Sequence, residues 1–367
     1  MSLLDQRTGQ DSSEAVEQQG GTAALGNGTA EAGLAAELSA SVHGQEKAVQ
    51  AVVRAVSIAR ARLVPVNRPL ANLLFVGPTG VGKTQLVRSL ARAVRTGEED
   101  FCRVDMSSLA QEHYAASLAG APPGYAGSKE GLSIFDRGKI ESSPDMPGIV
   151  LFDEIEKAHI TVVRSLLHVL DNGFLRLASG NETINFRNCI VVMTSNLGAG
   201  ETSRFRKGRA FQLLHAAAER MAAVAPEAAV FQHRHRAWAG RREASILDRA
   251  LEDFFDPEFL NRVDEVIRFE GLDPDVGRAI VRDQVKEVSA RLRRRYIELA
   301  VDDSAIDYLA RKGFSPQYGA RALERTMRLE LLAPLAARLS GVQASLAQPL
   351  QVRAALADGR IACRSRR

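Results

Sequence analysis

The chain has 367 residues, of which 45% are hydrophobic and 25% are charged, and its formal net charge is +4. This composition is typical of a soluble globular protein, and it excludes collagen-like, coiled-coil and wholly disordered chains. At about 150 residues per domain, the length predicts two domains and a remainder.

Localisation signals are missing from the sequence. The longest apolar runs, such as 149–152 and 190–193, are far shorter than the roughly 18 residues needed to cross a bilayer. The polar segment 1–10 lacks the apolar region of a secretory signal. The three cysteines are far apart and have no metal-ligand spacing. We therefore expect a cytoplasmic protein with reduced thiols and no membrane span.

Charge is distributed unevenly along the chain. Residues 1–37 hold six acidic side chains and one arginine, whereas residues 204–242 hold nine basic side chains and two glutamates. Because residues 1–36 contain few large apolar groups, they cannot bury enough surface to offset the entropy lost on ordering. This composition predicts a disordered tail over 1–36.

Short apolar runs then alternate with helical periodicity. The runs, each bounded by turn signals, are predicted as strands at 72–76, 101–104, 149–152, 190–193 and 266–269. Apolar residues at helical spacing predict helices over 42–62 and around 86–94 and 162–170. Continuous apolar strands separated by helices predict an α/β fold with a parallel sheet that is flanked by helices.

The alternation stops after residue 272, which we take as the end of a large domain over 37–272. Three helices and a strand are predicted beyond it, at 276–299, 304–311, 320–339 and near 350–354. They would form a small, mainly helical C-terminal domain over 273–355. Residues 356–367 are interpreted as a basic tail.

The strongest chemical signal follows the first predicted strand. Residues 77–84 match the phosphate-binding pattern G-x-x-x-x-G-K-[ST] between a strand and a helix. Glycine turns let backbone N–H groups point at phosphates in front of a helix N-terminus. Lys83 would reach the β- and γ-phosphates and Thr84 would bind Mg²⁺. The predicted cofactors are therefore ATP and Mg²⁺, and the predicted binding residues are Gly77, Pro78, Thr79, Gly80, Val81, Gly82, Lys83 and Thr84.

Two carboxylates follow the strand predicted at 149–152. Ligands of open α/β sheets lie at the carboxyl ends of the strands, so Asp153 and Glu154 are expected beside the nucleotide. Asp153 suits the Mg²⁺ sphere, and Glu154 suits a general base that polarises the attacking water. Asn196 follows the strand at 190–193, and its amide either bonds the water or the γ-phosphate, or only caps a turn. The residues alone leave these alternatives for Asn196 open.

Together these motifs resemble the AAA+ ATPases, and more narrowly the second ATPase module of the Clp disaggregase and unfoldase family. The resemblance covers about residues 38–354 and is carried by 42–45, 67–69, 77–84, 123–127, 151–159, 193–198, 257–265 and 318–321. It implies an AAA+ P-loop NTPase fold with a small C-terminal domain, ATP hydrolysis, and a homo-oligomer of six subunits in a ring.

The resemblance also implies roles for individual residues. Asn196 is similar to the sensor that positions the water, and Arg321 to a second sensor that reaches the γ-phosphate from the small domain. Arg262 is similar to the arginine finger, which acts on ATP bound by the neighbouring subunit. Val42 and His43 correspond to the segment beside the adenine, where His43 replaces a usual aliphatic residue. Without the resemblance, both arginines would be interpreted as solvated or ion-paired side chains.

Tyr125 indicates which process ATP hydrolysis would drive. Tyr125 and Ala126, flanked by Gly124 and Gly127, resemble the aromatic pore loop that grips a translocating polypeptide. A tyrosine on a loop offers an apolar ring and a polar tip with few rotatable bonds, so it can hold many different side chains. The alternative is a structural turn. The segment 173–183 corresponds to a second pore loop.

The sequence departs from this family in three further respects. We expect a single-module form without the N-terminal substrate domain, the first ATPase module and the coiled-coil middle domain of the long form. A basic insertion at about 201–250 is longer than expected, and we interpret it as a solvated, partly disordered surface loop. Its alternative role is contact with an acidic client, an adaptor or nucleic acid phosphates. A peptidase-docking tripeptide of the Ile-Gly-Phe/Leu type is not found.

The leading hypothesis is an ATP-dependent protein unfoldase, translocase or disaggregase that acts on polypeptide as a hexameric ring, with an adaptor protein as a further partner. Nucleic acid is not the expected partner. Two alternatives are a nucleic-acid-remodelling motor or loader, which would use the basic insertion as its contact surface, and a regulatory ATPase whose ring is a scaffold.

Overall fold

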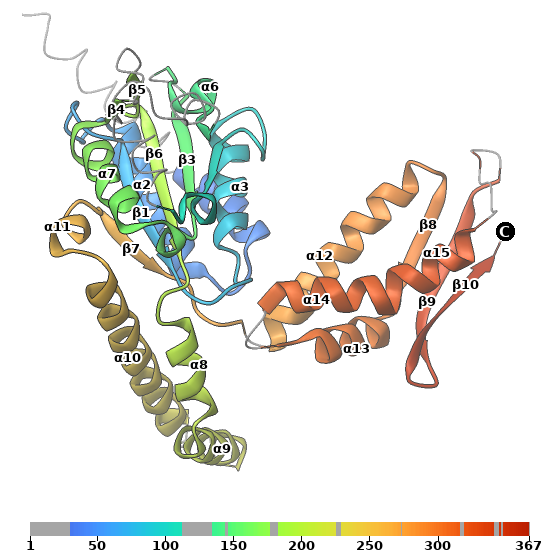
Figure 1. Cartoon of the computed structure of the whole chain (residues 1–367). Helices are drawn as coiled ribbons and strands as arrows, with labels where there is room; N and C mark the ends of the chain where they lie inside the picture. Colours follow the sequence, from blue (N-terminus) through green and yellow to red (C-terminus); the bar gives the residue numbers. More distant parts are fainter. Residues whose placement is uncertain are drawn as a thin grey trace, which may run out of the picture.

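A computed structural model describes the following residues, to which all structural statements below refer: 30–111, 134–143, 146–176, 183–224, 229–272, 274–315, 319–340, 345 and 348–366. No helix in these ranges is both long enough and apolar enough to span a membrane. The described residues form a large domain around a parallel sheet and a smaller C-terminal domain beside it (Figure 1).

Five parallel strands form the central sheet of the large domain. In spatial order they are β2 (Cys102–Asp105), β3 (Gly148–Asp153), β6 (Cys189–Ser195), β1 (Ala71–Val76) and β7 (Glu265–Arg268). Every neighbouring pair is parallel. The predicted α/β fold and its five strands are confirmed, with ends shifted by one or two residues.

Burial on both faces explains the apolar runs of the central strands. Leu73 and Phe75 of β1 belong to the core on one face of the sheet, and Leu74 and Val76 belong to the core on the other. Successive side chains of a strand point to opposite faces, so a strand covered on both sides needs apolar residues at every position. The covering helices are α2 (Glu46–Arg60) and α3 (Lys83–Val94) on the first face and α7 (Ile160–Asn172) on the second.

Shorter elements connect this framework. They are η1 (Met106–Leu109), α6 (Arg137–Ile140), η2 (Ile155–Lys157), β4 (Phe174–Arg176), β5 (Thr183–Asn185) and α11 (Pro257–Leu260). Strands β4 and β5 pair antiparallel as a separate two-stranded sheet.

Part of the disordered tail predicted over 1–36 is ordered, because residues 30–41 are helical. Leu34 and Leu38 of this helix are buried in the same core as α2 and α3. Two leucines spaced four residues apart share one helix face, and this face provides apolar area that the average composition does not reveal. Residues 1–29 lie outside the described residues.

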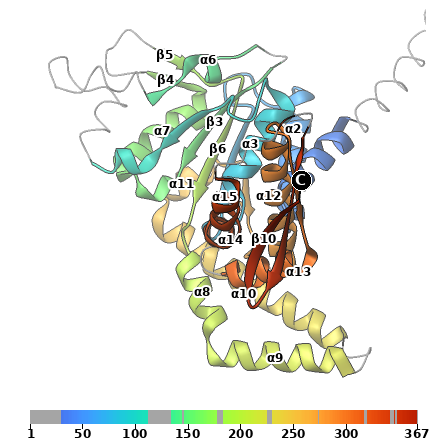
Figure 2. The ribbon, with the colours of Figure 1, turned by 90° about the vertical axis from the view of Figure 1, so that its right-hand side faces the viewer.

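The segment at 201–250 is also helical where it is described, so its interpretation as a partly disordered loop was wrong. Helices α8 (Ala199–Lys207), α9 (Arg209–Val224) and α10 (Ala229–Phe254) form it. We call them the α8–α10 arm. Figures 1 and 2 show the arm projecting from the sheet, with α9 at its far end.

Aromatic contacts join the helices of the arm, and buried leucines of α10 attach the arm to the core of the large domain. The Phe205 ring lies 5.1 Å from the Phe211 ring and 5.7 Å from the Trp238 ring, so α8, α9 and α10 meet at one cluster. Leu247 and Leu251 of α10 are buried in the core on the α7 face of the sheet. Some aromatic residues of the arm therefore pack helix on helix, whereas other apolar side chains of the arm are exposed.

The C-terminal domain contains a sheet in addition to its helices. Its helical elements are α12 (Pro274–Arg293), α13 (Asp303–Gly313), α14 (Gly319–Met327), the π-helical turn η4 (Arg328–Leu332) and α15 (Ala333–Leu339). Its three strands are β8 (Ile297–Val301), β9 (Leu350–Ala357) and β10 (Arg360–Arg366), in the order β10-β9-β8.

Two predictions for this domain were wrong. Residues 297–299, predicted as the end of a helix, belong to β8 and pair with β9. The basic tail predicted at 356–367 instead contains β10, which pairs antiparallel with β9. Ile361 is buried and Cys363 is half-buried, whereas arginines alternate with them. This alternation is the two-residue period of a strand with one buried face, and it was hidden by the basic composition.

Candidate nucleotide-binding site

The loop predicted to bind phosphate lies between β1 and α3, at the carboxyl end of β1. A close backbone approach requires a glycine at its start. A Cβ atom on Gly77 would lie 2.5 Å from the carbonyl oxygen of Phe269, and the φ of Gly77 is 150°. Other residues meet a steric penalty in this conformation. The predicted strand–loop–helix context of the motif is therefore present.

Lys83 opens α3 and folds back over the loop. Its side chain is almost fully buried, and its Nζ donates to the carbonyl oxygens of Gly77 at 2.5 Å and Pro78 at 3.0 Å. Burial lowers the pKa of Lys83 to about 8, opposed by the nearby Glu156, Asp153 and Glu154. A buried cation with three carboxylates around it is an electrostatic environment that a bound phosphate would change strongly.

The two carboxylates predicted at the end of β3 lie at the same edge of the sheet. Asp153 Oδ1 accepts a 2.6 Å hydrogen bond from Thr194 Oγ1, and Asp153 Oδ2 pairs with Arg103 Nη2 at 2.5 Å. Glu154 has a φ of 57°, in the left-handed region that non-glycine residues rarely adopt. Its backbone N–H donates to Thr194 Oγ1 at 2.9 Å. Such backbone strain concentrates at functional sites.

Asn196 joins the loop to the carboxylates. Its Oδ1 accepts from Lys83 Nζ at 2.8 Å and from Thr79 Oγ1 at 3.3 Å. Its Nδ2 donates to Glu154 Oε1 at 3.3 Å, and its backbone N–H donates to Glu156 Oε1 at 3.1 Å. The structure therefore brings together Lys83 at the start of α3, Glu154 after β3 and Asn196 after β6.

The sequence analysis missed the parts played by Thr194 and Arg103. Thr194 is fully buried at the end of the apolar run of β6. A hydroxyl at such a position indicates a hydrogen bond, and this could have predicted its role. Arg103 lies on β2, and only the strand order shows that β2 is next to β3. No local pattern in the sequence could have placed Arg103 against Asp153.

The small domain touches the phosphate loop through the start of α14. Ala320 N donates to Gly80 O at 2.8 Å. A Cβ atom on Gly319 would lie 2.5 Å from Gly80 O, and the φ of Gly319 is 53°. Arg321 follows this contact, and it lies close enough to Lys83 to contribute to its lowered pKa. Arg321 therefore lies within electrostatic reach of Lys83.

The two residues predicted beside the adenine, Val42 and His43, lie in different surroundings. Val42 is buried, and its Cγ1 lies 3.0 Å from where a Cβ atom on Gly82 would be. His43 points to the small domain instead, where its Nε2 lies 2.5 Å from Asp283 Oδ2 of α12. His43 therefore links the two domains next to the loop.

Arg262 is not part of this cluster. It follows α11, and its Nε lies 3.0 Å from Asp171 Oδ1 at the end of α7. Its side chain is 38% exposed. The structure therefore separates Arg262 from the groups that gather around Lys83.

Thr84 and Asp153 offer hard oxygen donors at the loop. Mg²⁺ is usually held by one or two protein oxygens, with phosphate oxygens and waters completing its shell. These two side chains fit that donor set. No group of three or more His, Cys, Asp or Glu side chains within the described ranges could hold a metal by itself. A nucleotide-dependent Mg²⁺ is the kind of ion that fits the residues present.

Some predicted residues cannot be placed. Tyr125 and Ala126 lie outside the described residues, as do Tyr318 and the central part of the second predicted pore loop, 177–182.

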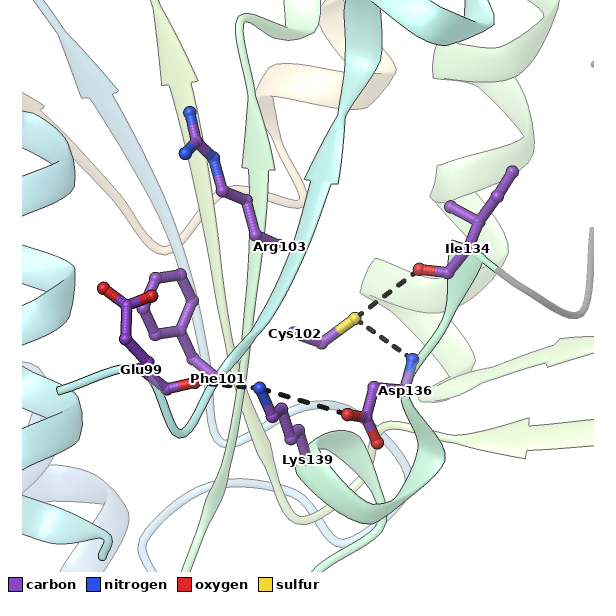
Figure 3. Close-up of a pocket in the computed structure, with 7 residues that line it drawn as sticks. All are labelled: Glu99, Phe101, Cys102, Arg103, Ile134, Asp136 and Lys139. Atoms are coloured by element: carbon purple, nitrogen blue, oxygen red, sulfur yellow. Dashed lines mark hydrogen bonds and ion pairs between the residues drawn. The ribbon is translucent and has the colours of Figure 1, made fainter. Parts of the chain in front are cut away.

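A separate pocket of about 540 Å³ lies at the outer edge of the sheet, beside β2 (Figure 3). Its polar groups bond to one another. Lys139 Nζ donates to the carbonyl oxygen of Glu99 at 2.8 Å, and Cys102 Sγ lies 3.4 Å from Asp136 N. Burial raises the pKa of the Cys102 thiol, so it is not an activated nucleophile. This pocket therefore presents no convergent chemical groups.

Comparisons with known proteins identify the family of this chain. The family model described as AAA domain (Cdc48 subfamily) matches residues 68–266, and the one described as C-terminal, D2-small domain, of ClpB protein matches residues 272–352. An "ATP-dependent protease ATP-binding subunit-like protein" of Rhodococcus erythropolis is 48% identical over 321 residues, which cover 88% of this chain and 86% of that protein. A protein of Pseudomonas aeruginosa with the same name and the addition "AmiB" is 46% identical over 306 residues, which cover 82% and 77% of the two chains.

The chaperone protein ClpB of Gloeobacter violaceus is 40% identical over 300 residues, which cover 82% of this chain and 31% of that protein. The matched part is thus about a third of the ClpB length. The P-loop geometry, the carboxylates beside it and these matches lead to one conclusion: the chain is an ATPase and belongs to the Clp family of AAA+ proteins.

Proposed function

We propose that this ATPase is a protein unfoldase, translocase or disaggregase that works as a hexameric ring and threads polypeptide through a central pore. The proposal rests on the observation that the candidate catalytic groups lie at two different places in the structure. Glu154 and Asn196 lie with Lys83 at the sheet edge, whereas Arg262 is exposed elsewhere, on Asp171. Because Arg262 lies away from the site of its own subunit, it can complete the site of the next subunit.

Within one subunit, the residues at the sheet edge would bind ATP and prepare the water. The loop N–H groups and Lys83 would bind the phosphates, with Thr84 and Asp153 as the Mg²⁺ donors. Bound Mg²⁺ would neutralise phosphate charge. Glu154 would accept the proton of the attacking water, and Asn196, which already bonds Glu154 at 3.3 Å, would orient that water.

Between subunits, Arg262 would stabilise the charge that develops on the γ-phosphoryl oxygens. A guanidinium presents several donors in a fixed plane and stays charged, so it suits this task. Because it comes from a neighbour, hydrolysis would depend on assembly. Arg321, beside the loop of its own subunit, would link the small domain to the nucleotide state.

The proposed work on polypeptide depends on Tyr125. An aromatic side chain between two glycines can contact many sequences without selecting among them. The test is the variant Tyr125→Ala, which should keep ATPase activity and lose unfolding of a fluorescent protein substrate. The control Tyr125→Phe keeps the ring and should retain most unfolding. Full unfolding activity in Tyr125→Ala would overturn the proposal.

A second candidate is supported by the arm. Exposed basic residues on it include Arg204, Arg209, Arg234 and Arg241. If the protein remodels nucleic acid, its DNA binding should fall steeply with salt and should be lost when Arg234 and Arg236 are changed to glutamine. Large exposed apolar side chains lie on the same arm, among them Leu213 at 72% and Trp238 at 41%. Apolar groups favour a protein surface, so this candidate ranks second.

A further inference from the structure

Asn72 is a fully buried polar residue in the second position of β1. Its Nδ2 donates to two backbone carbonyl oxygens, that of Leu170 at 3.0 Å and that of Arg262 at 3.0 Å. Both carbonyls come from segments far away in the sequence. One buried amide therefore ties β1 to the end of α7 and to the loop that carries Arg262.

The orientation of this amide follows from its partners. Turned the other way, Asn72 would direct its side-chain oxygen at two carbonyl oxygens, and none of these three atoms carries a hydrogen. Asn72 Oδ1 itself has no hydrogen-bond partner among the described residues. The contacts thus use the donor capacity of the amide in full and leave its acceptor unused.

One of these carbonyls belongs to Arg262. The other belongs to Leu170, which precedes Asp171, the ion-pair partner of Arg262. Leu170 lies in the last turn of α7, where carbonyl groups have no partner within the helix. The next residue, Asp171, holds the Arg262 guanidinium with a 3.0 Å contact between Oδ1 and Nε. Asn72 therefore fixes the backbone of Arg262 and the backbone that presents its carboxylate partner.

We propose that Asn72 is a positioning residue for Arg262. This inference rests on the proposed function, in which Arg262 acts on the nucleotide of a neighbouring copy. A side chain that must reach across a subunit boundary needs a backbone held at a defined place, because a displacement of about 1 Å can cost roughly 100-fold in rate. Asn72 provides this hold from the interior of its own subunit.

The surrounding hydrogen bonds make the effect selective. Asn72 N donates to Asp264 Oδ2 at 2.7 Å, and Asp264 N donates to Asn72 O at 2.8 Å. Both bonds use the backbone of residue 72, so they persist in any side-chain variant. Asn72→Ala should therefore release the Arg262 carbonyl while the start of β7 stays paired to β1.

The first test compares binding with turnover. In Asn72→Ala, the nucleotide dissociation constant should stay within about twofold of the wild type, while kcat for ATP falls at least about tenfold. Asn72→Leu, which fills the space but has no donor, should behave in the same way. Circular dichroism melting identifies a variant that fails to fold, and the other variant then provides the answer. Wild-type kcat in a folded variant would overturn the inference.

The second test asks whether the damage lies in the neighbour's site. Glu154→Gln subunits should be inactive but carry an intact Arg262. Mixed with Asn72→Ala subunits, they should raise ATPase activity per Asn72→Ala subunit several-fold, because each supplies a correctly placed arginine. Subunits that carry both Glu154→Gln and Arg262→Ala should produce no rise. Failure of the first mixture to raise activity would contradict the inference.

Two controls separate this inference from the function on which it rests. Asn188 also donates its Nδ2 to two carbonyl oxygens, those of Ser142 and Ser143, but it has no contact with Arg262. Asn188→Ala should leave kcat near the wild-type value. Arg262→Ala should lose activity and regain it with Glu154→Gln subunits. If it does neither, the proposed function fails; if only Asn72→Ala fails to regain activity, the inference alone fails.

Discussion

The polar residues of the sheet edge and those of the α8–α10 arm have opposite surroundings. At the sheet edge, Lys83, Asn196 and Glu154 are held by hydrogen bonds between loops that follow buried strands. On the arm, exposed arginines and large exposed apolar side chains share one projecting unit. Five of the eleven exposed large hydrophobic residues among the described ones lie there, so the arm is the part of the described surface best suited to contact another protein.

The hydrogen-bonded groups thus lie at the edge of the central sheet, whereas the exposed apolar and basic side chains lie on a projecting unit. The nucleotide site depends on a backbone fixed by the central sheet, where a change of one atom has a large effect. The arm is joined to the core mainly by the base of α10. Changes on the arm should therefore leave nucleotide turnover intact.

The largest effect is expected at Glu154. Glu154→Gln should reduce ATP turnover by about 100-fold or more, since general-base catalysis contributes on this scale, while ATP affinity is retained. Lys83→Ala should instead weaken nucleotide binding itself. Phosphate release and the fluorescence of a labelled nucleotide measure the two effects separately. Turnover at the wild-type rate in Glu154→Gln would mean that another group is the base.

The next effect concerns the contact between the small domain and the loop. Gly319→Ala places a Cβ atom 2.5 Å from Gly80 O at a φ of 53°. Strain of about 1 to 3 kcal/mol should push α14 and Arg321 away from the loop, so ATP affinity should fall about tenfold. Isothermal titration of the variant measures this loss. Unchanged affinity would show that this interdomain contact is not needed for binding.

A pH effect on stability is expected at Asp100, away from both regions. Asp100 is partly desolvated, but hydrogen bonds from Arg95 and Thr96 lower its pKa to about 2. A lowered carboxylate pKa stabilises the fold at pH values above the ordinary pKa of 3.8, and this contribution is lost as the pH falls from about 4 to about 2. Asp100→Asn should lower the free energy of unfolding by about 1.5 kcal/mol at pH 7.

Urea unfolding at several pH values checks the Asp100 prediction. The difference between wild type and Asp100→Asn should shrink below about pH 4. The control Asp303→Asn, an 80% exposed partner of Arg282, should change stability little at any pH. A difference for Asp100→Asn that stays constant down to pH 3 would contradict the assigned hydrogen bonds.

The smallest effect, of opposite sign, is expected on the arm. A Cβ atom on Gly240 of α10 meets nothing within 4 Å. Gly240→Ala should therefore stabilise the helix by about 0.5 to 1 kcal/mol without changing ATPase activity. Thermal unfolding and phosphate release measure the two quantities. A loss of turnover in this variant would show that the arm and the nucleotide site are coupled.

Much of the large domain could be predicted because its signals are local. A strand buried on both faces is a continuous apolar run, and a phosphate loop needs its glycines and lysine at a fixed spacing. The five strands and the loop at 77–84 were found in this way. The sequence also placed Glu154 and Asn196 at strand ends, where the structure brings them together.

The rest depends on long-range pairing. The Arg103–Asp153 contact requires the order of β2 and β3, and the Asn72 contacts require α7 and the Arg262 loop to meet at β1. The helices of the arm pack through an aromatic cluster. In β10 the arginines obscure the alternation of buried and exposed side chains. Composition indicated loops or tails at both places, because average polarity does not report which few side chains are buried.

The central claim is that ATP turnover at the boundary between neighbouring copies moves a polypeptide through a ring. Electron microscopy with a slowly hydrolysed ATP analogue and a labelled unfolded protein tests it most directly. The account predicts rings of six subunits with Arg262 facing the neighbour's nucleotide and an extended chain in the channel beside Tyr125. Particles that stay monomeric with nucleotide, or rings whose channel never contains a chain, would contradict it.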